Sequence, residues 1–187
     1  MRIVAGRHRG RPLVAPDGRL ARPTADRARQ ALFNILGHTP LVELDGADVV
    51  DCFAGTGALG LEALSQGARH ASFIENQPAA LAALAANIAS LGETATTTIL
   101  RGDATRPPPA AAPCRLALLD PPYHSGLAVP CLTALAAGGW LTPDALAVVE
   151  VARDEGLAPP EGFAIEDDRV YGAARLLFLV RSAETHE

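Results

Sequence analysis

The chain has 187 residues and a mass of 19.4 kDa, which predicts one domain with a small extension at most. Hydrophobic residues make up 49% and charged residues 20% of it, so the composition excludes wholesale disorder, and no apolar run is long enough to cross a membrane. The formal net charge of −5, taken as an average, argues against a nucleic-acid partner.

The N-terminal segment predicts a small unit ahead of the main domain. Short apolar stretches at 2–5 and 11–15 indicate a β-hairpin with an arginine-rich turn. Thr24 is predicted to be the N-cap of a helix whose apolar face has helical spacing and which ends at Gly37. Residues 1–37 are therefore expected to form a basic extension.

The rest of the chain, 38–187, alternates between strand and helix patterns. The predicted strands are 48–52, 70–75, 96–101, 115–119 and 146–152, and the predicted helices are 58–66, 78–92 and 127–137. Two further apolar stretches, 163–170 and 175–181, predict a closing hairpin. Repeated strand–helix units indicate an α/β fold whose parallel sheet is covered on both faces.

The charges are divided unevenly along the chain. Residues 1–30 contain eight arginines and two acids, a net charge of +6. The other 157 residues contain eight arginines and 19 acids, a net charge of −11. Such asymmetry indicates that the basic segment meets a nucleic acid.

A glycine-rich loop follows the first strand of the alternating region. The segment 51–60 reads DCFAGTGALG and opens a helix, so its backbone can approach a ligand and its N–H groups can bind one. Glu75 lies 20 residues after Gly55, at the tip of the next strand, where a carboxylate can accept hydrogen bonds from both ribose hydroxyls. This predicts a nucleoside-containing cofactor but does not identify it, because Gly55-x-Gly57-x-x-Gly60 also matches the dinucleotide fingerprint.

A second motif, Asp120-Pro121-Pro122-Tyr123, follows the fourth strand of the alternating region. Its prolines make a rigid turn at the carboxyl edge of the sheet, where open α/β sheets bind ligands. Asp120 and the Pro121 carbonyl are placed to accept hydrogen bonds from an exocyclic amine, while Tyr123 stacks on the ring that carries it. The turn is thus predicted to hold an amine for methylation, with catalysis by positioning and electrostatics.

The third predicted strand also ends in a polar residue, Asp103. An aspartate there can accept a hydrogen bond from the amino group of an adenine, or it can cap its own loop. The sequence leaves both interpretations open.

Together these segments resemble the Rossmann-like S-adenosylmethionine-dependent amino-methyltransferases. More narrowly, the chain resembles the bacterial guanine-N2 methyltransferases of small-subunit ribosomal RNA, the RsmD family. Three blocks carry the resemblance, namely 1–36, 51–68, and 120–123 followed by Tyr171-Gly172. The first block is the specific one, because the other motifs occur across many methyltransferases.

The resemblance implies a Rossmann-like methyltransferase fold. Its sheet would be mostly parallel and seven-stranded, with a terminal antiparallel hairpin, and a small N-terminal β-hairpin and helix would extend it. Residues 1–37 would contact RNA and residues 38–187 would form the methyltransferase domain. The implied reaction moves a methyl group from S-adenosylmethionine to the exocyclic N2 of one guanine in 16S rRNA, flipped out of its surroundings in an assembled or assembling small ribosomal subunit.

The resemblance also assigns roles to residues. The loop from Asp51 would hold the methionine part of the cofactor, Glu75 its ribose, and Asp103 would lie by its adenine. The expected cofactor-binding residues are Asp51, Phe53, Ala54, Gly55, Thr56, Gly57, Glu75, Asn76, Asp103 and Ala104. Those expected to hold the guanine are Asp120, Pro121, Pro122 and Tyr123. Those expected to contact RNA are Arg7, Arg9, Arg11, Arg22, Thr24 and Arg27, and the first three alternate, so an extended ribbon would present them on one face.

Two alternatives stay open on the sequence alone. The target amine could be an adenine N6 in DNA or another RNA amine, because the Asp-Pro-Pro-Tyr turn serves several amines. The glycine loop also fits a dinucleotide-binding oxidoreductase. The three cysteines are odd in number and far apart, and the histidines show no ligand spacing, so we expect no disulfide framework, no metal and a cytoplasmic location.

Overall fold

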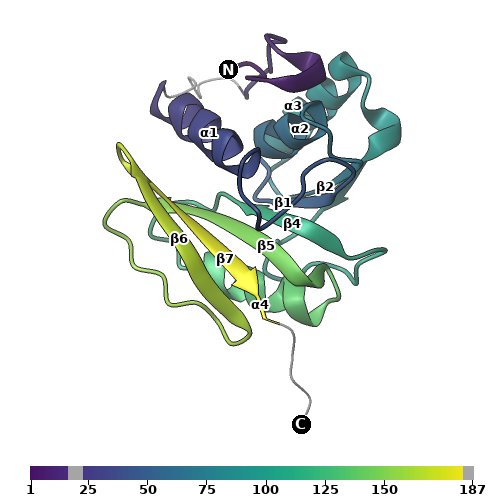
Figure 1. Cartoon of the computed structure of the whole chain (residues 1–187). Coiled ribbons are helices and arrows are strands. Elements are labelled where there is room, and N and C mark those ends of the chain that lie inside the picture. Colours follow the sequence, from purple (N-terminus) through teal and green to yellow (C-terminus); the bar gives the residue numbers. More distant parts are fainter. Residues whose placement is uncertain (17–22, 183–187) are drawn as a thin grey trace.

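The computed structural model describes residues 1–16 and 23–182, and a seven-stranded sheet runs through it in the order β3-β2-β1-β4-β5-β7-β6 (Figure 1). The strands are β1 (Asp48–Cys52), β2 (His70–Glu75), β3 (Thr97–Arg101), β4 (Cys114–Leu119), β5 (Leu141–Ala152), β6 (Phe163–Tyr171) and β7 (Ala174–Arg181). The helices are α1 (Pro23–Leu36), α2 (Ala58–Ser65), α3 (Pro78–Leu91) and α4 (Ala128–Ala137), with short 3-10 helices η1 (Gly6–His8) and η2 (Thr94–Thr96). The predicted succession of strands and helices is confirmed.

The pairing of the strands confirms a mostly parallel sheet with an antiparallel end. Strands β1 to β5 pair in parallel, and β7 is inserted antiparallel between β5 and β6. Strand β5 begins five residues earlier than predicted, at Leu141 opposite Cys114. Its register then shifts until Leu146 pairs with Leu116, and the shifted stretch contains Pro143, which has no N–H group to donate to a ladder.

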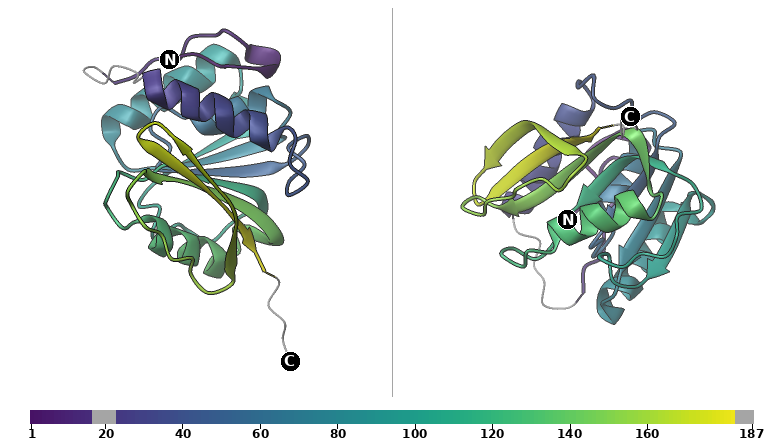
Figure 2. Two further views of the ribbon diagram at one scale, coloured as in Figure 1. Left: turned by 60° about the vertical axis from the view of Figure 1, so that its left-hand side comes forward. Right: turned by 90° about the horizontal axis from the view of Figure 1, so that it is seen from below.

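Both faces of the sheet are covered, as expected (Figures 1 and 2). Alternate strand residues such as Val49 and Leu118 pack in one apolar cluster with α1, α2 and α3. The residues between them, such as Val50 and Leu119, pack in a second cluster with α4. Within the described ranges, no helix has the length and apolarity needed to cross a membrane.

The N-terminal segment pairs as the predicted hairpin, with hydrogen bonds from the Ile3 N–H to the Arg11 carbonyl and from the Leu13 N–H to the Met1 carbonyl, but its turn differs from an extended ribbon. One isolated antiparallel bridge joins Arg2 and Pro12, and η1 lies between them, so Arg7 sits in a helical turn instead of an extended ribbon. The expectation that alternate arginines share one face is therefore wrong. Helix α1 begins at Pro23, the position that proline favours, and Thr24 lies inside the first turn instead of capping it.

The N-terminal segment is bound tightly to α2. The buried Glu62 carboxylate accepts the N–H groups of Val4 and Ala5, at 2.8 and 2.9 Å. The Ser65 hydroxyl accepts the His8 N–H at 2.9 Å and donates to the Ala5 carbonyl at 2.6 Å. Residues 1–14 and α1 also add apolar side chains to the core of the sheet, namely Ile3, Leu13, Leu32, Phe33 and Leu36.

A glycine makes this close approach to α2 sterically allowed. Gly6 has φ +76°, and a Cβ there would lie 1.8 Å from the Ser65 carbonyl oxygen. We expect Gly6→Ala to lower the free energy of unfolding by roughly 1–3 kcal/mol more than Gly10→Ala. Gly10 has a similar φ of +83°, but a Cβ there would meet no atom within 4 Å, so it controls for backbone strain alone. Chemical denaturation measures the difference, and equal losses would contradict a steric role for Gly6.

Candidate active site

The carboxyl ends of β1, β2 and β4 meet at one edge of the sheet. The Ala54 N–H donates to the Ile74 carbonyl at 3.2 Å, and the Asp120 N–H donates to the Cys52 carbonyl at 3.4 Å. The Gly55 N–H donates to the Glu75 carboxylate at 2.8 Å. The glycine loop, Glu75 and the Asp-Pro-Pro-Tyr turn, which are far apart in the sequence, are thus brought together.

The glycine loop between β1 and α2 has an unusual backbone. Phe53, Gly55 and Gly57 all have positive φ, at 59°, 56° and 79°, and such conformations in non-glycine residues concentrate at functional sites. A Cβ on Gly57 would meet a methyl carbon of Leu84 at 2.4 Å, so this glycine is required for packing. A Cβ on Gly55 would meet nothing closer than 3.9 Å, so this side of the loop is open to a ligand.

Asp51 lies at the base of this loop. It is buried, and its Oδ2 accepts the Gly60 N–H at 2.8 Å. Its Oδ1 is buried without a hydrogen-bond partner in the described part of the chain. Burial raises the pKa of Asp51 well above its usual range, and the nearby negative charges of Asp120 and Glu75 raise it further. The site therefore favours a positively charged donor at Oδ1.

Glu75 ends β2 as predicted and is buried at the site. Besides the Gly55 N–H, its carboxylate accepts the N–H groups of Asn76 and Gln77, at 2.8 and 2.7 Å. Three backbone donors fix the carboxylate against the glycine loop. Because two carboxylate oxygens offer about four lone pairs, acceptor capacity remains for a ligand hydroxyl.

Asp103 follows β3, and its Oδ1 accepts the N–H and the hydroxyl of Thr105, both at 2.8 Å. These hydrogen bonds lower the pKa of Asp103, and they show that it caps its own loop, one of the two interpretations of the sequence. The Ala104 side chain is buried in the cluster on the α4 face. In the described part of the chain, no group of three or more His, Cys, Asp or Glu side chains is placed to hold a metal ion.

The Asp-Pro-Pro-Tyr turn is held by residues from β5 and the loop after it. The Tyr123 hydroxyl donates to Glu150 Oε1 at 2.8 Å. The His124 N–H donates to Glu155 Oε2 at 2.8 Å, and His124 itself has a positive φ of 57°. Tyr123 as a whole remains 37% exposed.

Glu150 is a site residue that the sequence interpretation missed. The protein around Asp120 desolvates its carboxylate, although solvent still reaches it, and the charge of Glu150 adds to this effect, so the pKa of Asp120 rises to about 7. Burial also raises the pKa of Glu150, opposed by the hydrogen bond from Tyr123. The sequence feature that could have indicated Glu150 is its position as the single carboxylate in the apolar run 145–152, close to the carboxyl end of a predicted strand.

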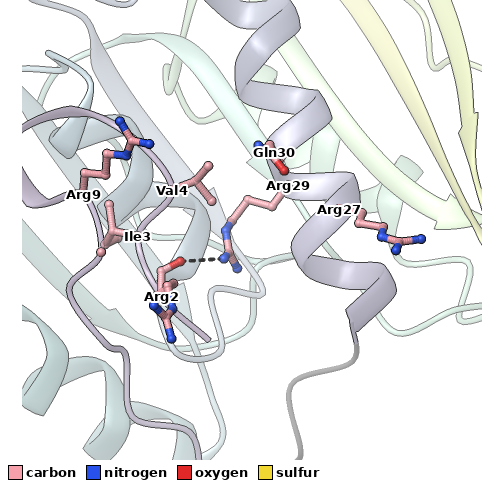
Figure 3. A pocket seen from close by; sticks show the side chains of 8 residues that line it. Arg2, Ile3, Val4, Arg9, Arg27, Arg29 and Gln30 are labelled. Carbon is pink, nitrogen blue, oxygen red and sulfur yellow. Dashed lines mark hydrogen bonds between the residues drawn. The ribbon is translucent and has the colours of Figure 1, made fainter.

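A second candidate site lies between the N-terminal segment and α1 (Figure 3). It is an open pocket of about 400 Å³ in which Arg29, itself buried, donates to the Arg2 carbonyl at 2.8 Å. No acidic residue is among the described residues that line it, which are Arg2, Ile3, Val4, Arg9, Gly10, Arg27, Arg29 and Gln30. We call these residues the arginine pocket. Its chemistry suits a phosphate group.

The other predicted RNA-contact residues lie elsewhere. Arg7 pairs with Glu93, its Nη2 at 2.7 Å from Glu93 Oε1. Arg11 donates to the Ser90 carbonyl at 2.6 Å. Both are thus directed to the C-terminal end of α3 instead of to the arginine pocket. Arg22 and the side chain of Thr24 lie outside the described residues.

Comparison with known proteins identifies the family. The family model described as "Conserved hypothetical protein 95" matches residues 1–180. The chain is also 35% identical over 185 residues to Ribosomal RNA small subunit methyltransferase D of Escherichia coli (strain K12), an alignment that covers 98% of this chain and 91% of that protein. The chain belongs to the RsmD family of methyltransferases.

Two further proteins are similar to this chain along nearly its whole length. Ribosomal RNA small subunit methyltransferase D of Haemophilus influenzae is 33% identical over 178 residues, covering 92% of this chain and 89% of that protein. The solved structure of yhhF from Escherichia coli has a TM-score of 0.84 and 35% identity, covering 98% of this chain and 99% of that one. The Rossmann-like methyltransferase fold expected from the sequence is therefore confirmed.

Proposed function

We propose that this protein transfers a methyl group from S-adenosylmethionine to the exocyclic N2 of one guanine in 16S rRNA. The observation that carries the proposal is the Asp120–Tyr123 turn, which is hydrogen-bonded to the end of β1 beside the glycine loop. Relatives named for small-subunit ribosomal RNA, aligned along nearly the whole chain, support the class of substrate. The reaction would take place in the cytoplasm, on an assembled or assembling small ribosomal subunit.

The residues at the glycine loop fit a cofactor that carries an ammonium group and a ribose. An ammonium group beside Asp51 Oδ1 would supply the missing donor and stabilise the ionised carboxylate. Glu75 retains acceptor capacity for ribose hydroxyls, and the open side of Gly55 leaves room for backbone contact. When bound there, S-adenosylmethionine supplies an electrophilic methyl group on a positively charged sulfur.

The Asp-Pro-Pro-Tyr turn would bind the guanine and accept the proton that its amine loses. Asp120 and the Pro121 carbonyl would accept hydrogen bonds from the guanine amine, and the Tyr123 side chain would stack on the ring. An aromatic amine is a weak nucleophile, and these hydrogen bonds increase the electron density on its nitrogen. As the nitrogen gains the methyl group it loses one proton, which passes to the Asp120 carboxylate. A pKa of about 7 suits a group that accepts a proton at neutral pH.

One experiment tests the reaction directly. The protein is incubated with labelled S-adenosylmethionine and unmodified 16S rRNA, both free and in small subunits, and the labelled nucleoside is mapped. We expect N2-methylguanosine at a single position. If the label appears instead as N6-methyladenosine, in the RNA or in DNA added as a control, the target is adenine and the proposal is wrong. A separate titration of the protein with S-adenosylhomocysteine and with NAD tests the oxidoreductase alternative. Binding of NAD without binding of S-adenosylhomocysteine would support that alternative.

The arginine pocket is proposed to hold a phosphate of the RNA. Converting Arg2, Arg9 and Arg27 to Gln removes its three exposed cations while keeping the buried Arg29. We expect weaker RNA binding, and a plot of log affinity against log salt whose slope is shallower by about 1 for each phosphate that the variant no longer binds. Cofactor affinity should not change. Filter binding at several salt concentrations measures the slope.

Arg115→Gln is the matched control, because Arg115 is exposed and pairs with Asp144 outside the arginine pocket. It should leave both RNA affinity and the salt slope unchanged. If the pocket variant and the control bind RNA equally well, the pocket does not contact phosphate.

A further inference from the structure

Strand β5 places a second carboxylate, that of Glu150, beside the Asp-Pro-Pro-Tyr turn. Strands β4 and β5 are parallel and Leu119 lies opposite Val149, so Asp120 and Glu150 follow at the next position of two neighbouring strands. The charge of Glu150 raises the pKa of Asp120, which reflects their proximity. Neither carboxylate forms an ion pair with a described residue. Two carboxylates thus lie together at the edge where the target base is proposed to bind.

The protein uses one oxygen of Glu150 and leaves the other available. Oε1 accepts the hydroxyl of Tyr123 at 2.8 Å, which orients the ring proposed to stack on the base. No donor from the described residues hydrogen-bonds to Oε2, and the side chain is only half-buried. Such an oxygen favours a ligand N–H group.

The bases differ in what they present to a pair of acceptors. The Watson–Crick edge of guanine carries two adjacent donors, the N1–H and the N2 amine. Adenine and cytosine each place a ring-nitrogen acceptor beside their amine. This nitrogen would face an ionised carboxylate, which is also an acceptor, so no hydrogen bond could form between them. Enzymes that act on a flipped base read this edge by hydrogen bonds. A site with two neighbouring carboxylates therefore favours guanine.

We infer that Glu150 selects guanine by accepting the N1–H while Asp120 and the Pro121 carbonyl hold the N2 amine. This inference rests on the proposed function and adds a specificity-determining residue to it. Through Oε1 the same side chain holds Tyr123, so one residue links the stacking ring to the polar edge of the base.

The test uses an analogue that keeps the amine and removes the N1–H. Once the methylated guanine is mapped, 16S rRNA is prepared with guanine or 2-aminopurine at that position, and kcat/KM is measured for both. We expect the wild-type protein to prefer guanine by about 100-fold or more. In Glu150→Gln the preference should fall to within about 10-fold, because a neutral amide can meet either a donor or an acceptor.

Two further variants separate recognition from loss of structure. Tyr123→Phe removes the hydrogen bond to Glu150 but keeps its carboxylate, so the rate should fall while the preference for guanine persists. Glu166→Gln, an exposed carboxylate on β6, should change neither quantity. If wild type methylates guanine and Glu150→Gln keeps the full preference, the role of Glu150 is refuted and the proposed function stands. If wild type methylates another base, the proposed function fails and this inference with it.

Discussion

Replacing Asp120 by asparagine is expected to lower the rate of methyl transfer on the order of 1,000-fold, because the amide cannot take up the proton released by the amine. Affinity for S-adenosylhomocysteine should stay within about threefold of wild type. Asp120 is hydrogen-bonded to the end of β1 through its backbone N–H, which the variant keeps. Single-turnover kinetics and calorimetric titration measure the two quantities.

Asp154→Asn is the control, because Asp154 is an exposed carboxylate beside His124 of the same turn. It should leave the rate unchanged. Equal losses of rate and of cofactor affinity in Asp120→Asn would overturn the assigned role, since they would show that Asp120 organises the cofactor site instead of the acceptor.

The raised pKa of Asp120 also predicts a pH profile. Its carboxylate is protonated below a pKa of about 7 and ionised above it, and only the ionised form accepts a proton. We therefore expect kcat/KM to rise with pH through this region and then level off. Glu150→Gln removes a neighbouring negative charge, so it should move the rise to lower pH. A flat profile between about pH 5.5 and 8.5 would contradict this protonation step.

Replacing Glu62 by alanine is expected to lower the free energy of unfolding by about 3–5 kcal/mol. Its buried carboxylate accepts the N–H groups of Val4 and Ala5, and its Oε2 lies 4.0 Å from the Arg29 guanidinium. The variant leaves a buried guanidinium without this charge partner and two backbone donors without an acceptor. Urea denaturation followed by circular dichroism measures the loss.

Gln66→Ala is the control for Glu62, because Gln66 is only partly buried and donates one hydrogen bond to the same carboxylate. Its loss should be below about 1 kcal/mol. A similarly small loss in Glu62→Ala would show that the N-terminal segment is held by its apolar contacts alone.

The sequence predicted the sheet well because each strand carries its own signal. Strands β1 and β2 are short segments with buried apolar residues such as Val49, Val50 and Ile74, and their predicted bounds are those of the structure. The glycine loop and the Asp-Pro-Pro-Tyr turn were also local signals, and topology alone brings the ends of parallel strands to one edge.

What the sequence did not predict depends on contacts between distant segments. Glu150 and Tyr123 are 27 residues apart, and nothing local to β5 marks its carboxylate as a partner of the turn. The N-terminal segment pairs as the predicted hairpin, but the short helical turn η1, which begins at Gly6 against α2, replaces the expected extended ribbon. This turn sends Arg7 toward Glu93, whereas the alternation in the sequence placed it beside Arg9.

The anchoring of residues 1–14 to α2 fixes a permanent electric dipole in the molecule. Residues 1–14 contain four arginines and no acid, a net charge of +4, and they are hydrogen-bonded to α2 of a main domain rich in acids, so these charges keep their places when the protein approaches a polyanion. The field of an RNA would rotate the whole protein before contact, attracting the arginine pocket and repelling phosphates from the carboxylates at the sheet edge. Collisions would then be productive more often than random orientation allows, and added salt would remove this advantage.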